Sequence, residues 1–356
     1  MNKQVKKLIG KLSSEAILVS KTQNIFYLTG FDGFSSEERE GYLLLTKNKQ
    51  YVLTDGRYTE AVKKFISDFK LIEISPSKKI ADILKEIVAK EKIKKIAIDE
   101  HDISTEEFLK IKKIVKICSD ANTIEKLREI KRPQEVSQIK NACKLGDLIF
   151  KYILTKIKTG VTEREIAKKI EIFILSNNAS ISFTPIVAFG INSSSPHHIP
   201  SNKKLKNNEI VLLDFGVKIN NYCSDMTRTV FKGKATLEQK YIYKTVLKAQ
   251  EEAIEFIAKT KKIDAKKVDK IARDYILSKG FPSIPHSLGH GIGLEVHEAP
   301  GLSPKSGYKI KKGMVFSIEP GIYIPGFGGI RIEDLVFYDG ENPQLISRAK
   351  KQIIEL

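Results

Sequence analysis

The chain has 356 residues, of which 41% are hydrophobic, and its 61 lysine and arginine residues outnumber its 43 aspartate and glutamate residues to give a formal net charge of +18. This length exceeds what one hydrophobic core usually supports, so two domains are expected. No uncharged apolar run reaches the roughly 18 residues of a membrane span, and the N-terminal segment lacks the apolar stretch of a secretion signal. We therefore expect a soluble protein without a membrane partner.

The positive charge is carried almost entirely by lysines scattered through amphipathic segments, without arginine clusters or an aromatic and basic platform. This pattern is typical of a solvated surface and makes a nucleic-acid partner the less favoured interpretation. Cys118, Cys143 and Cys223 are odd in number and widely spaced. Their spacing argues against a disulfide or cysteine–zinc framework and predicts reduced thiols in a cytoplasmic protein.

Residues 15–100 alternate helical patterns with the short β-rich runs "EAILVS", "YLLLT", "QYVLT", "KLIEI" and "KIAID". This alternation predicts an α/β layer domain. A boundary is predicted near residue 122, which assigns residues 1–122 to this domain and residues 123–356 to a second one. His101, the single histidine of the first domain, is predicted to lie on the surface.

The second domain begins with a long predicted helix, because Pro133 suits a helix start and apolar residues recur at helical spacing from Val136 to Ile157. Another helix is predicted over "TEREIAKKIEIFILSN". Strands around 184–231, two helices across 236–279 and a strand-rich tail with many glycines and prolines follow.

The segment "EIVLLDFGVKINNYCSDMTRTV" is predicted to form a hairpin, because two β-rich runs flank Asn220-Asn221, a good two-residue turn. A turn centred there places Asp225 opposite Gly216, with Asp214 one diagonal step away on the same face. An aspartate within an apolar strand is usually paired or ligated, so metal ligation is favoured over a structural hydrogen bond.

The segment "MVFSIEPGIYIPGFGGIRIEDLVFY" is also predicted to fold back on itself. A turn centred near Phe327 places Glu319 and Glu333 on one face, a diagonal step apart. Four converging carboxylates cannot all stay ionised without cations. Two divalent metals about 3.5 Å apart, bridged by carboxylates and a water, resolve the repulsion, and the oxygen-rich set suits manganese, cobalt or iron.

Between these acidic segments lies "IPHSLGHGIGLEVHEAP", which holds His286, His290 and His297. Its glycines rule out a well-formed helix and let backbone and imidazole approach a guest closely. A metal ion is the commonest such guest of histidine.

In chain order, "LLDFG", "SDMTRT", "GHGIGLEVHE", "SIEPGIY" and "GIRIED" resemble the successive signatures of the pita-bread metallopeptidases, the family of Xaa-Pro aminopeptidase, prolidase, methionine aminopeptidase and creatinase. "NIFYLTGFDGF" and "YVLTDGRYTEA" resemble the creatinase-type N-terminal domain. The resemblance covers nearly the whole chain. It implies an α/β N-terminal domain and an α+β pita-bread C-terminal domain, in which two pseudo-equivalent halves surround a curved antiparallel sheet with the metals in its concavity.

The resemblance also implies a set of ligands for two divalent ions per subunit, with manganese as the first choice and cobalt, iron or zinc as alternatives. In this scheme a bridging hydroxide is the nucleophile and Glu319 accepts its proton. Asp225 and Glu333 would bridge the ions. The complete ligand set is Asp214, Asp225, His290, Glu319 and Glu333.

The other histidines have several interpretations. His197 matches the family histidine of a G-x-N-x(4)-H pattern, a proton-relay position, whereas its neighbour His198 is expected to be an ordinary exposed loop residue. His297 matches the histidine that hydrogen-bonds the substrate carbonyl, and its alternative is a satisfied core histidine. His286 is expected in the pocket wall, where structural and functional roles are equally open.

Arg331 lies two residues before Glu333, on the same strand face, so it can orient that ligand or meet a substrate carboxylate. Tyr323 is a candidate for the same substrate pocket, although a strand tyrosine more often belongs to the core.

The leading functional prediction is hydrolysis of the amino-terminal Xaa-Pro bond of peptides, which proline protects from ordinary peptidases. The alternative is an Xaa-Pro dipeptidase (prolidase). In several prolidases of the family an arginine directly follows H-E-x-P, where it holds the carboxylate of the dipeptide. Here Gly301 stands at that position, so longer peptides are the predicted substrates.

Two further classes remain. A metal-free creatinase-like or partner-binding relative is disfavoured, because none of the ligands is missing from the sequence. Nucleic-acid binding through the basic charge is the other. Because family members of this length are often dimers, a homodimer is expected.

Overall fold

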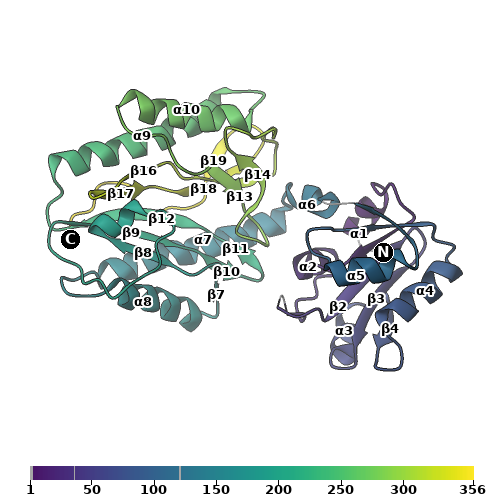
Figure 1. The fold of residues 1–356 in the computed structure, drawn as a ribbon. Helices are drawn as coiled ribbons and strands as arrows, with labels where there is room; N and C mark the ends of the chain where they lie inside the picture. Colours follow the sequence, from purple (N-terminus) through teal and green to yellow (C-terminus); the bar gives the residue numbers. More distant parts are fainter. Residues whose placement is uncertain (1–2, 36, 120–121) are drawn as a thin grey trace. The chain divides into compact units, whose positions relative to one another are not determined.

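The computed structural model describes residues 3–35, 37–119 and 122–356, and the chain divides into two compact units, residues 1–128 and 129–356. Figure 1 shows both. The predicted boundary near residue 122 falls just before helix α6 (Thr123–Arg128), whereas the units divide after it. Helix α6 belongs to the first unit because the Tyr27 hydroxyl donates to the Leu127 carbonyl over 3.0 Å and the Asn24 amide donates to Glu125 over 2.8 Å.

The first unit is built on one six-stranded mixed sheet with the order β4-β3-β2-β1-β5-β6. Every residue of β1 and β2 is buried, so the centre of the sheet is covered on both faces. His101 is exposed, as predicted. The α/β layer prediction is confirmed, and only the last strand had no counterpart in it. The strands are β1 (Ala16–Val19), β2 (Gly41–Thr46), β3 (Gln50–Asp55), β4 (Lys70–Ile74), β5 (Lys95–Ile98) and β6 (Lys116–Ser119). The helices are α1 (Lys3–Ile9), α2 (Thr22–Thr29), α3 (Thr59–Phe65), α4 (Ile80–Lys90) and α5 (Thr105–Lys112).

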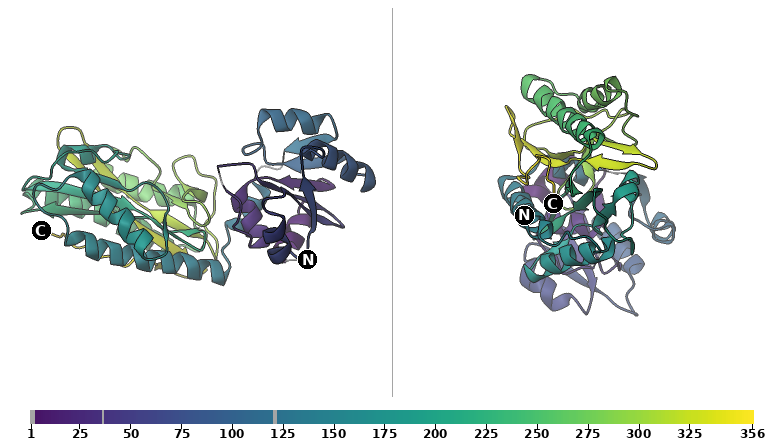
Figure 2. Two further views of the ribbon diagram at one scale, coloured as in Figure 1. Left: turned by 90° about the horizontal axis from the view of Figure 1, so that it is seen from below. Right: turned by 90° about the vertical axis from the view of Figure 1, so that its left-hand side faces the viewer.

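The second unit consists of two halves, each with a pair of helices and its own strands. Figures 1 and 2 show the strands between the pair α7 and α8 and the pair α9 and α10. Each pair packs on a separate hydrophobic cluster. The prediction of an α+β pita-bread domain is confirmed. The helices are α7 (Pro133–Leu154), α8 (Glu163–Ser176), α9 (Leu237–Lys259) and α10 (Ala265–Ser278).

Short antiparallel ladders make up the strands of this unit. The first half has the three-stranded sheets β11-β10-β7 and β12-β9-β8, and the second half has the sheets β14-β13-β15-β18-β19 and β16-β17. No helix in the described part of the chain is both long and apolar enough to cross a membrane. The strands are β7 (Ser180–Ile181), β8 (Ile186–Phe189), β9 (Glu209–Phe215), β10 (Val217–Ile219), β11 (Tyr222–Cys223), β12 (Met226–Lys232), β13 (Gly289–Gly291), β14 (Glu298–Leu302), β15 (Val315–Ile318), β16 (Gly321–Ile324), β17 (Gly328–Arg331), β18 (Asp334–Tyr338) and β19 (Pro343–Leu345).

The first predicted hairpin is confirmed together with its register. Ile219 pairs with Tyr222 around a turn whose two residues, Asn220 and Asn221, have positive φ values of 47° and 69°. Such values define the two-residue turn that suits the twist of a hairpin. The same register continues beyond an interruption, where Met226 pairs with Phe215. The register therefore places Asp225 opposite Gly216, as predicted.

The second hairpin turns one position earlier than predicted. Ile324 pairs with Gly328, so the turn is centred on Gly326, whose φ of 80° is in the left-handed region, and not on Phe327. The ladder of β15 and β18 keeps the same register, with Ile318 opposite Asp334. As a result the two glutamates of this hairpin face each other directly, and the predicted diagonal step is wrong.

Candidate active site

A cavity of about 520 Å³ lies in the second unit, and both halves of that unit line it. Its lining combines apolar side chains, among them Phe183, Pro185, Ile186, Ile199 and Val296, with many ionisable ones. The ionisable and imidazole side chains of the lining are His197, His198, Asp214, Asp225, His286, His290, His297, Glu319, Arg331 and Glu333. All five ligands that the family resemblance implies therefore reach the same cavity.

Interrupted ladders bring the carboxylates together. Glu319 and Glu333 lie where the β15–β18 ladder has ended and the β16–β17 ladder has not begun. Their backbone amides bond to other segments: Glu319 donates to the carbonyl of Leu288, just before β13, over 2.8 Å, and Glu333 donates to the carbonyl of Thr227 in β12 over 3.1 Å. Because each backbone is tied to a neighbouring segment, both side chains are held at the cavity.

The imidazole of His290 points into the carboxylate cluster. Its Nδ1 lies 3.1 Å from the Gly291 carbonyl, which assigns the proton to that nitrogen. Its Nε2 lies 3.2 Å from Glu319 Oε1 and 3.6 Å from Asp225 Oδ2. Asp225, His290 and Glu333 each offer one ligand atom, and the three atoms lie within 4.8 Å of one another.

Unsatisfied oxygens show that this cluster fits cations. Asp214 Oδ1, Asp225 Oδ1 and Glu333 Oε1 are buried without a hydrogen-bond partner. A buried carboxylate oxygen without a partner is costly, and a divalent ion among several such oxygens removes the cost. Four carboxylates and one imidazole are a donor set that accommodates two such ions.

The pKa shifts have the same origin. Burial and the charge of Glu333 raise the pKa of Asp225 well above its usual range, and burial and the charge of Glu319 do the same to the pKa of Glu333. Burial opposes protonation of His290, yet its hydrogen bond to Glu319 raises the pKa to about 9. For Glu319 burial is outweighed by the hydrogen bond from His290, and its pKa is lowered. Without metal ions, Asp225, Glu333 and His290 therefore keep their protons to a higher pH than usual.

Arg331 uses its guanidinium for hydrogen bonds with other residues of the protein. Only 3% of its surface is exposed, and its guanidinium donates to Asp214 Oδ2 over 2.6 Å, to the Tyr323 hydroxyl over 2.7 Å and to Thr227 Oγ1 over 2.9 Å. Of the two roles left open by the sequence, the geometry therefore supports orientation of a ligand, and the ligand is Asp214 and not the nearby Glu333.

Tyr323 lies behind the cavity and not in its described lining. Its hydroxyl is bonded to Arg331 and lies 2.9 Å from His286 Nε2, and burial raises its pKa to about 12. His286 itself lines the cavity, as predicted. Tyr323 thus connects the histidine of the wall with the arginine that holds Asp214.

His197 and His297 both reach the cavity and are both exposed to solvent. The alternative of a satisfied core histidine is therefore wrong for His297. The rings of His290 and His297 meet edge to face with their centroids 4.3 Å apart. Burial and the charge of His290 lower the pKa of His297, so its neutral form is favoured.

The expectation for His198 is corrected. This side chain is half-buried, and its Nε2 lies 2.8 Å from Glu163 Oε2. Glu163, at the first position of α8, is fully buried and also accepts from the backbone amide of Phe189, the side chain of Asn192, and the amide and hydroxyl of Ser201. These donors flank the loop that carries His197, so Glu163 is the anchor of that loop.

Sequence reasoning missed two residues that hold candidate ligands and one, Glu163, that anchors the loop of His197. Thr227 Oγ1 donates to Glu333 Oε2 over 2.7 Å, and Ser317 Oγ donates to Glu319 Oε1 over 3.1 Å. Thr227 lies inside the "SDMTRT" segment, so the sequence placed it near a candidate ligand but did not reveal its hydrogen bond to Glu333. Nothing in the sequence marks Glu163 except its place at the start of a predicted helix, because its hydrogen-bond partners come from elsewhere in the chain.

The two-domain fold and this cavity define a metal-dependent hydrolase built on a creatinase-type scaffold. Comparison with known proteins supplies the family. Residues 137–339 match metallopeptidase family M24, and residues 2–130 match the creatinase/prolidase N-terminal domain. The chain belongs to metallopeptidase family M24, and the resemblance inferred from its motifs is confirmed.

Relatives match the chain over almost its whole length. It is 34% identical to an Xaa-Pro dipeptidase of Pyrococcus horikoshii, over 99% of each chain. Among solved structures, an Xaa-Pro dipeptidase from Bacillus anthracis superimposes with a TM-score of 0.92 at 33% identity, covering 99% of this chain and 98% of that one. An X-Pro aminopeptidase from Thermotoga maritima does so with a TM-score of 0.89 at 33% identity, covering 99% and 100%.

Proposed function

We propose that this protein hydrolyses the amino-terminal Xaa-Pro bond of peptides as an Xaa-Pro aminopeptidase. The observation that carries the proposal is the convergence of four carboxylates and His290 in the lining of one cavity, with buried oxygens that lack partners. The names of the relatives, Xaa-Pro dipeptidase and X-Pro aminopeptidase, support the choice of bond. Proline's tertiary amide and fixed φ demand such a dedicated site.

The proposed ligands are Asp214, Asp225, His290, Glu319 and Glu333, which fit two divalent ions, with manganese as the first choice. When bound, such ions activate water and polarise a carbonyl group. The chain's own contribution is to aim the donors: Arg331 fixes Asp214, Thr227 fixes Glu333 and Ser317 fixes Glu319.

Proton transfer is assigned to three side chains of the cavity. Glu319 is proposed to accept the proton of the attacking water, since its lowered pKa keeps it ionised. His197, on the loop that Glu163 anchors, is proposed to relay a proton to the leaving amine. His297, which is favoured in its neutral form, is proposed to donate a hydrogen bond to the carbonyl oxygen of the scissile bond.

The choice of aminopeptidase over dipeptidase depends on which positively charged side chains line the cavity. A dipeptidase has to neutralise a carboxylate directly after proline. Among the described residues of the cavity lining, Arg331 is the one arginine or lysine, and it already pairs with Asp214. At Gly301, which pairs with His290, an added Cβ meets nothing within 4 Å, and no cationic side chain stands at this position to hold the carboxylate of a dipeptide.

Xaa-Pro dipeptidase is the second candidate, and the names of the Pyrococcus and Bacillus relatives favour it. A cleavage panel of Xaa-Pro dipeptides and Xaa-Pro-Yaa tripeptides decides between the two. Chelation should abolish hydrolysis, and manganese or cobalt should restore it. Unchanged turnover after verified metal removal would refute the metal-dependent mechanism, and cleavage of dipeptides alone would refute the aminopeptidase.

We further propose that the protein is a cytoplasmic homodimer. Its three cysteines are all free, as a reducing compartment requires. Light scattering on the purified full chain measures the oligomeric state directly.

A further inference from the structure

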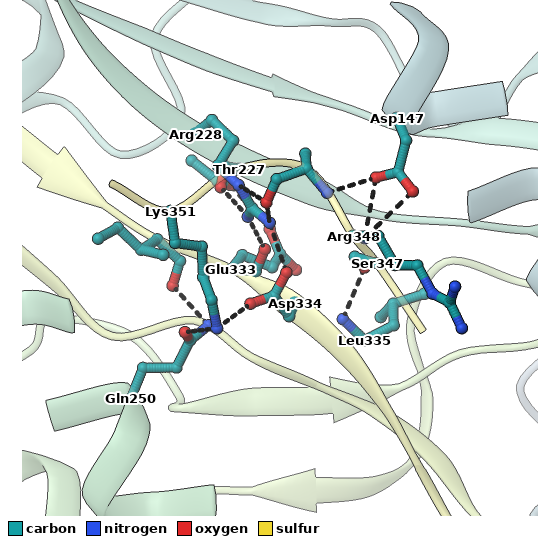
Figure 3. A network of polar contacts seen from close by, with 12 residues as sticks. Asp147, Thr227, Arg228, Gln250, Glu333, Asp334, Leu335, Ser347, Arg348 and Lys351 are labelled. Atoms are coloured by element: carbon teal, nitrogen blue, oxygen red, sulfur yellow. Dashed lines mark hydrogen bonds and ion pairs between the residues drawn. The ribbon is translucent and has the colours of Figure 1, made fainter. Parts of the chain in front are cut away.

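A polar network adjoins the candidate ligand Glu333 (Figure 3), and its residues Arg228, Asp334 and Lys351 are not among those described as lining the cavity. Its centre is Arg228 of β12, which is 1% exposed. The guanidinium donates to Asp334 Oδ1 over 2.5 Å and to the carbonyl of Glu333. It also donates to the carbonyl of Thr227 over 2.9 Å. Arg228 thus holds the backbones of both Glu333 and Thr227, the residue that bonds the Glu333 side chain.

The C-terminal segment completes this network. Lys351 Nζ forms an ion pair with Asp334 Oδ2 at 2.8 Å and donates to Gln250 Oε1 over 2.9 Å. Gln250 Nε2 in turn donates to the carbonyls of Ile318 and Ile332 over 3.0 and 3.3 Å. Those two residues directly precede Glu319 and Glu333 in the chain. One side chain of α9 therefore links the two strands that deliver these candidate ligands.

The segment that carries Lys351 is fastened on both sides. The Leu335 amide donates to Ser347 Oγ over 3.1 Å, and the Ala349 amide donates to Asp147 of α7 over 2.7 Å. Arg228 Nη2 donates to the Ala349 carbonyl over 2.9 Å. Figure 3 shows these contacts on both sides of the segment, together with those of Lys351 and Arg228 to Asp334. Residues 347–351 are therefore packed into the second unit as a structural element and are not a free tail.

The positive charge of Lys351 stabilises the buried carboxylate of Asp334. Asp334 is fully buried and lies between two cations, Arg228 and Lys351. Without Lys351, Asp334 keeps Arg228 at Oδ1, but its buried Oδ2 loses its cation and Gln250 Oε1 loses its donor, so the neighbouring groups rearrange. Here those neighbours are Gln250 and the backbone of Glu333, so the rearrangement is transmitted to Glu319 and Glu333.

We propose that Lys351 is a positioning residue of the metal centre, which acts through Asp334 and Gln250, and that the C-terminal segment 347–351 is part of the machinery that holds the metals. None of these residues lines the cavity. The inference rests on the proposed metal-dependent function. Groups that orient metal ligands typically contribute about 10- to 100-fold in metal affinity.

The test is a manganese titration of the full chain, freed of metal by chelation, in a calorimeter. Lys351→Met should weaken the affinity of at least one manganese site by about tenfold or more. Lys350→Met is the matched control, because its side chain is exposed and one residue away, and it should bind like the wild type. Lys351→Arg keeps the charge beside Asp334 and should recover part of the loss.

Circular dichroism establishes that each variant is folded before titration. If Lys351→Met does not fold, Gln250→Leu decides, since it keeps the ion pair but cuts the link to both ligand strands; a similar loss of affinity supports the proposal. If Lys351→Met folds and binds manganese with wild-type affinity, the proposal is overturned. If Lys351→Met does not fold, wild-type affinity in Gln250→Leu overturns it. Wild-type protein that binds no divalent ion would instead overturn the proposed metallopeptidase function.

Discussion

Glu319 and Glu333 face each other across a gap between two antiparallel ladders that share one register. On one side of the gap Ile318 pairs with Asp334, and on the other Gly321 pairs with Arg331. At the gap itself Glu319 donates its backbone amide to Leu288 and Glu333 donates its amide to Thr227, and both carboxylates line the cavity. Asp225 lies in a comparable interruption of the first hairpin. Asp225, Glu319 and Glu333 thus lie where a ladder breaks, whereas Asp214 pairs with Thr227 within the β9–β12 ladder.

Asp225→Ala should lose at least one of the two metal ions, because a residue proposed to bridge serves both. Metal analysis of the purified variant by mass spectrometry measures this. Asp274→Ala is the matched control, since Asp274 is exposed on α10. Retention of two metal ions per subunit in Asp225→Ala would contradict the ligand assignment.

Metal-free protein should become less stable as the pH rises from 6 to 9. Asp225 and Glu333, with raised pKa values, keep protons in the folded chain that the unfolded chain loses above about pH 4. His290, with a pKa of about 9, does so above its ordinary value of 6.5. Stability therefore falls with pH over this window, whereas the lowered pKa of Glu319 acts only at lower pH.

Because cations replace these protons, the increase in Tm on adding manganese should grow over the same pH range. Thermal melts with manganese or a chelator at several pH values measure the effect. Asp225→Asn should flatten the pH dependence of the metal-free protein. A manganese effect that is constant from pH 6 to 9 would show that the buried groups do not titrate as described.

His197→Ala should lower kcat by about 10²-fold and leave the metal content intact, because it removes a proposed proton shuttle and no ligand. Steady-state kinetics on an Xaa-Pro peptide measure kcat, with His101→Ala as the control on the exposed surface of the first unit. Wild-type turnover in His197→Ala would transfer the role to His198 or to solvent.

Glu163→Gln should lower kcat/KM by about tenfold without changing the number of bound metals. The carboxylate accepts bonds from five donors, and a glutamine amide, with one acceptor oxygen, leaves several of them without a partner. The loop that carries His197 is then less well positioned. Glu171→Gln on the same helix is the control. Loss of metal from Glu163→Gln would show a wider structural role than anchoring the loop.

Gly301→Arg should shift the preference from Xaa-Pro-Yaa tripeptides toward Xaa-Pro dipeptides. Gly301 pairs with His290 in the β13–β14 ladder, and an added Cβ there meets nothing within 4 Å, so the backbone accepts a side chain, and an arginine beside this candidate ligand would supply a cation for the substrate carboxylate. The ratio of kcat/KM for the two substrate lengths measures the shift. Gly307→Arg, equally unobstructed, is the control and should leave the ratio unchanged.

The sequence by itself determined the features that short stretches encode. The Asn220-Asn221 turn and the flanking β-rich runs specify a hairpin and its register locally, so the position of Asp225 was predictable. The motif order identified the family and the five candidate ligands. In the second hairpin Gly326, Gly328 and Gly329 permit more than one turn, and only the ladder of β15 with β18 selects the one that makes Glu319 and Glu333 face each other.

Tertiary structure alone decided how these side chains are held. Arg331 had two open roles, and its contact with Asp214 settled them because β17 lies against the strand that carries this aspartate. His198 gained its partner from α8, and Lys351 gained Asp334 and Gln250 from a strand and a helix far from it in the chain. Spacing and periodicity describe neighbours along the chain, whereas a buried charge is stabilised by whatever groups the packing of distant segments brings beside it.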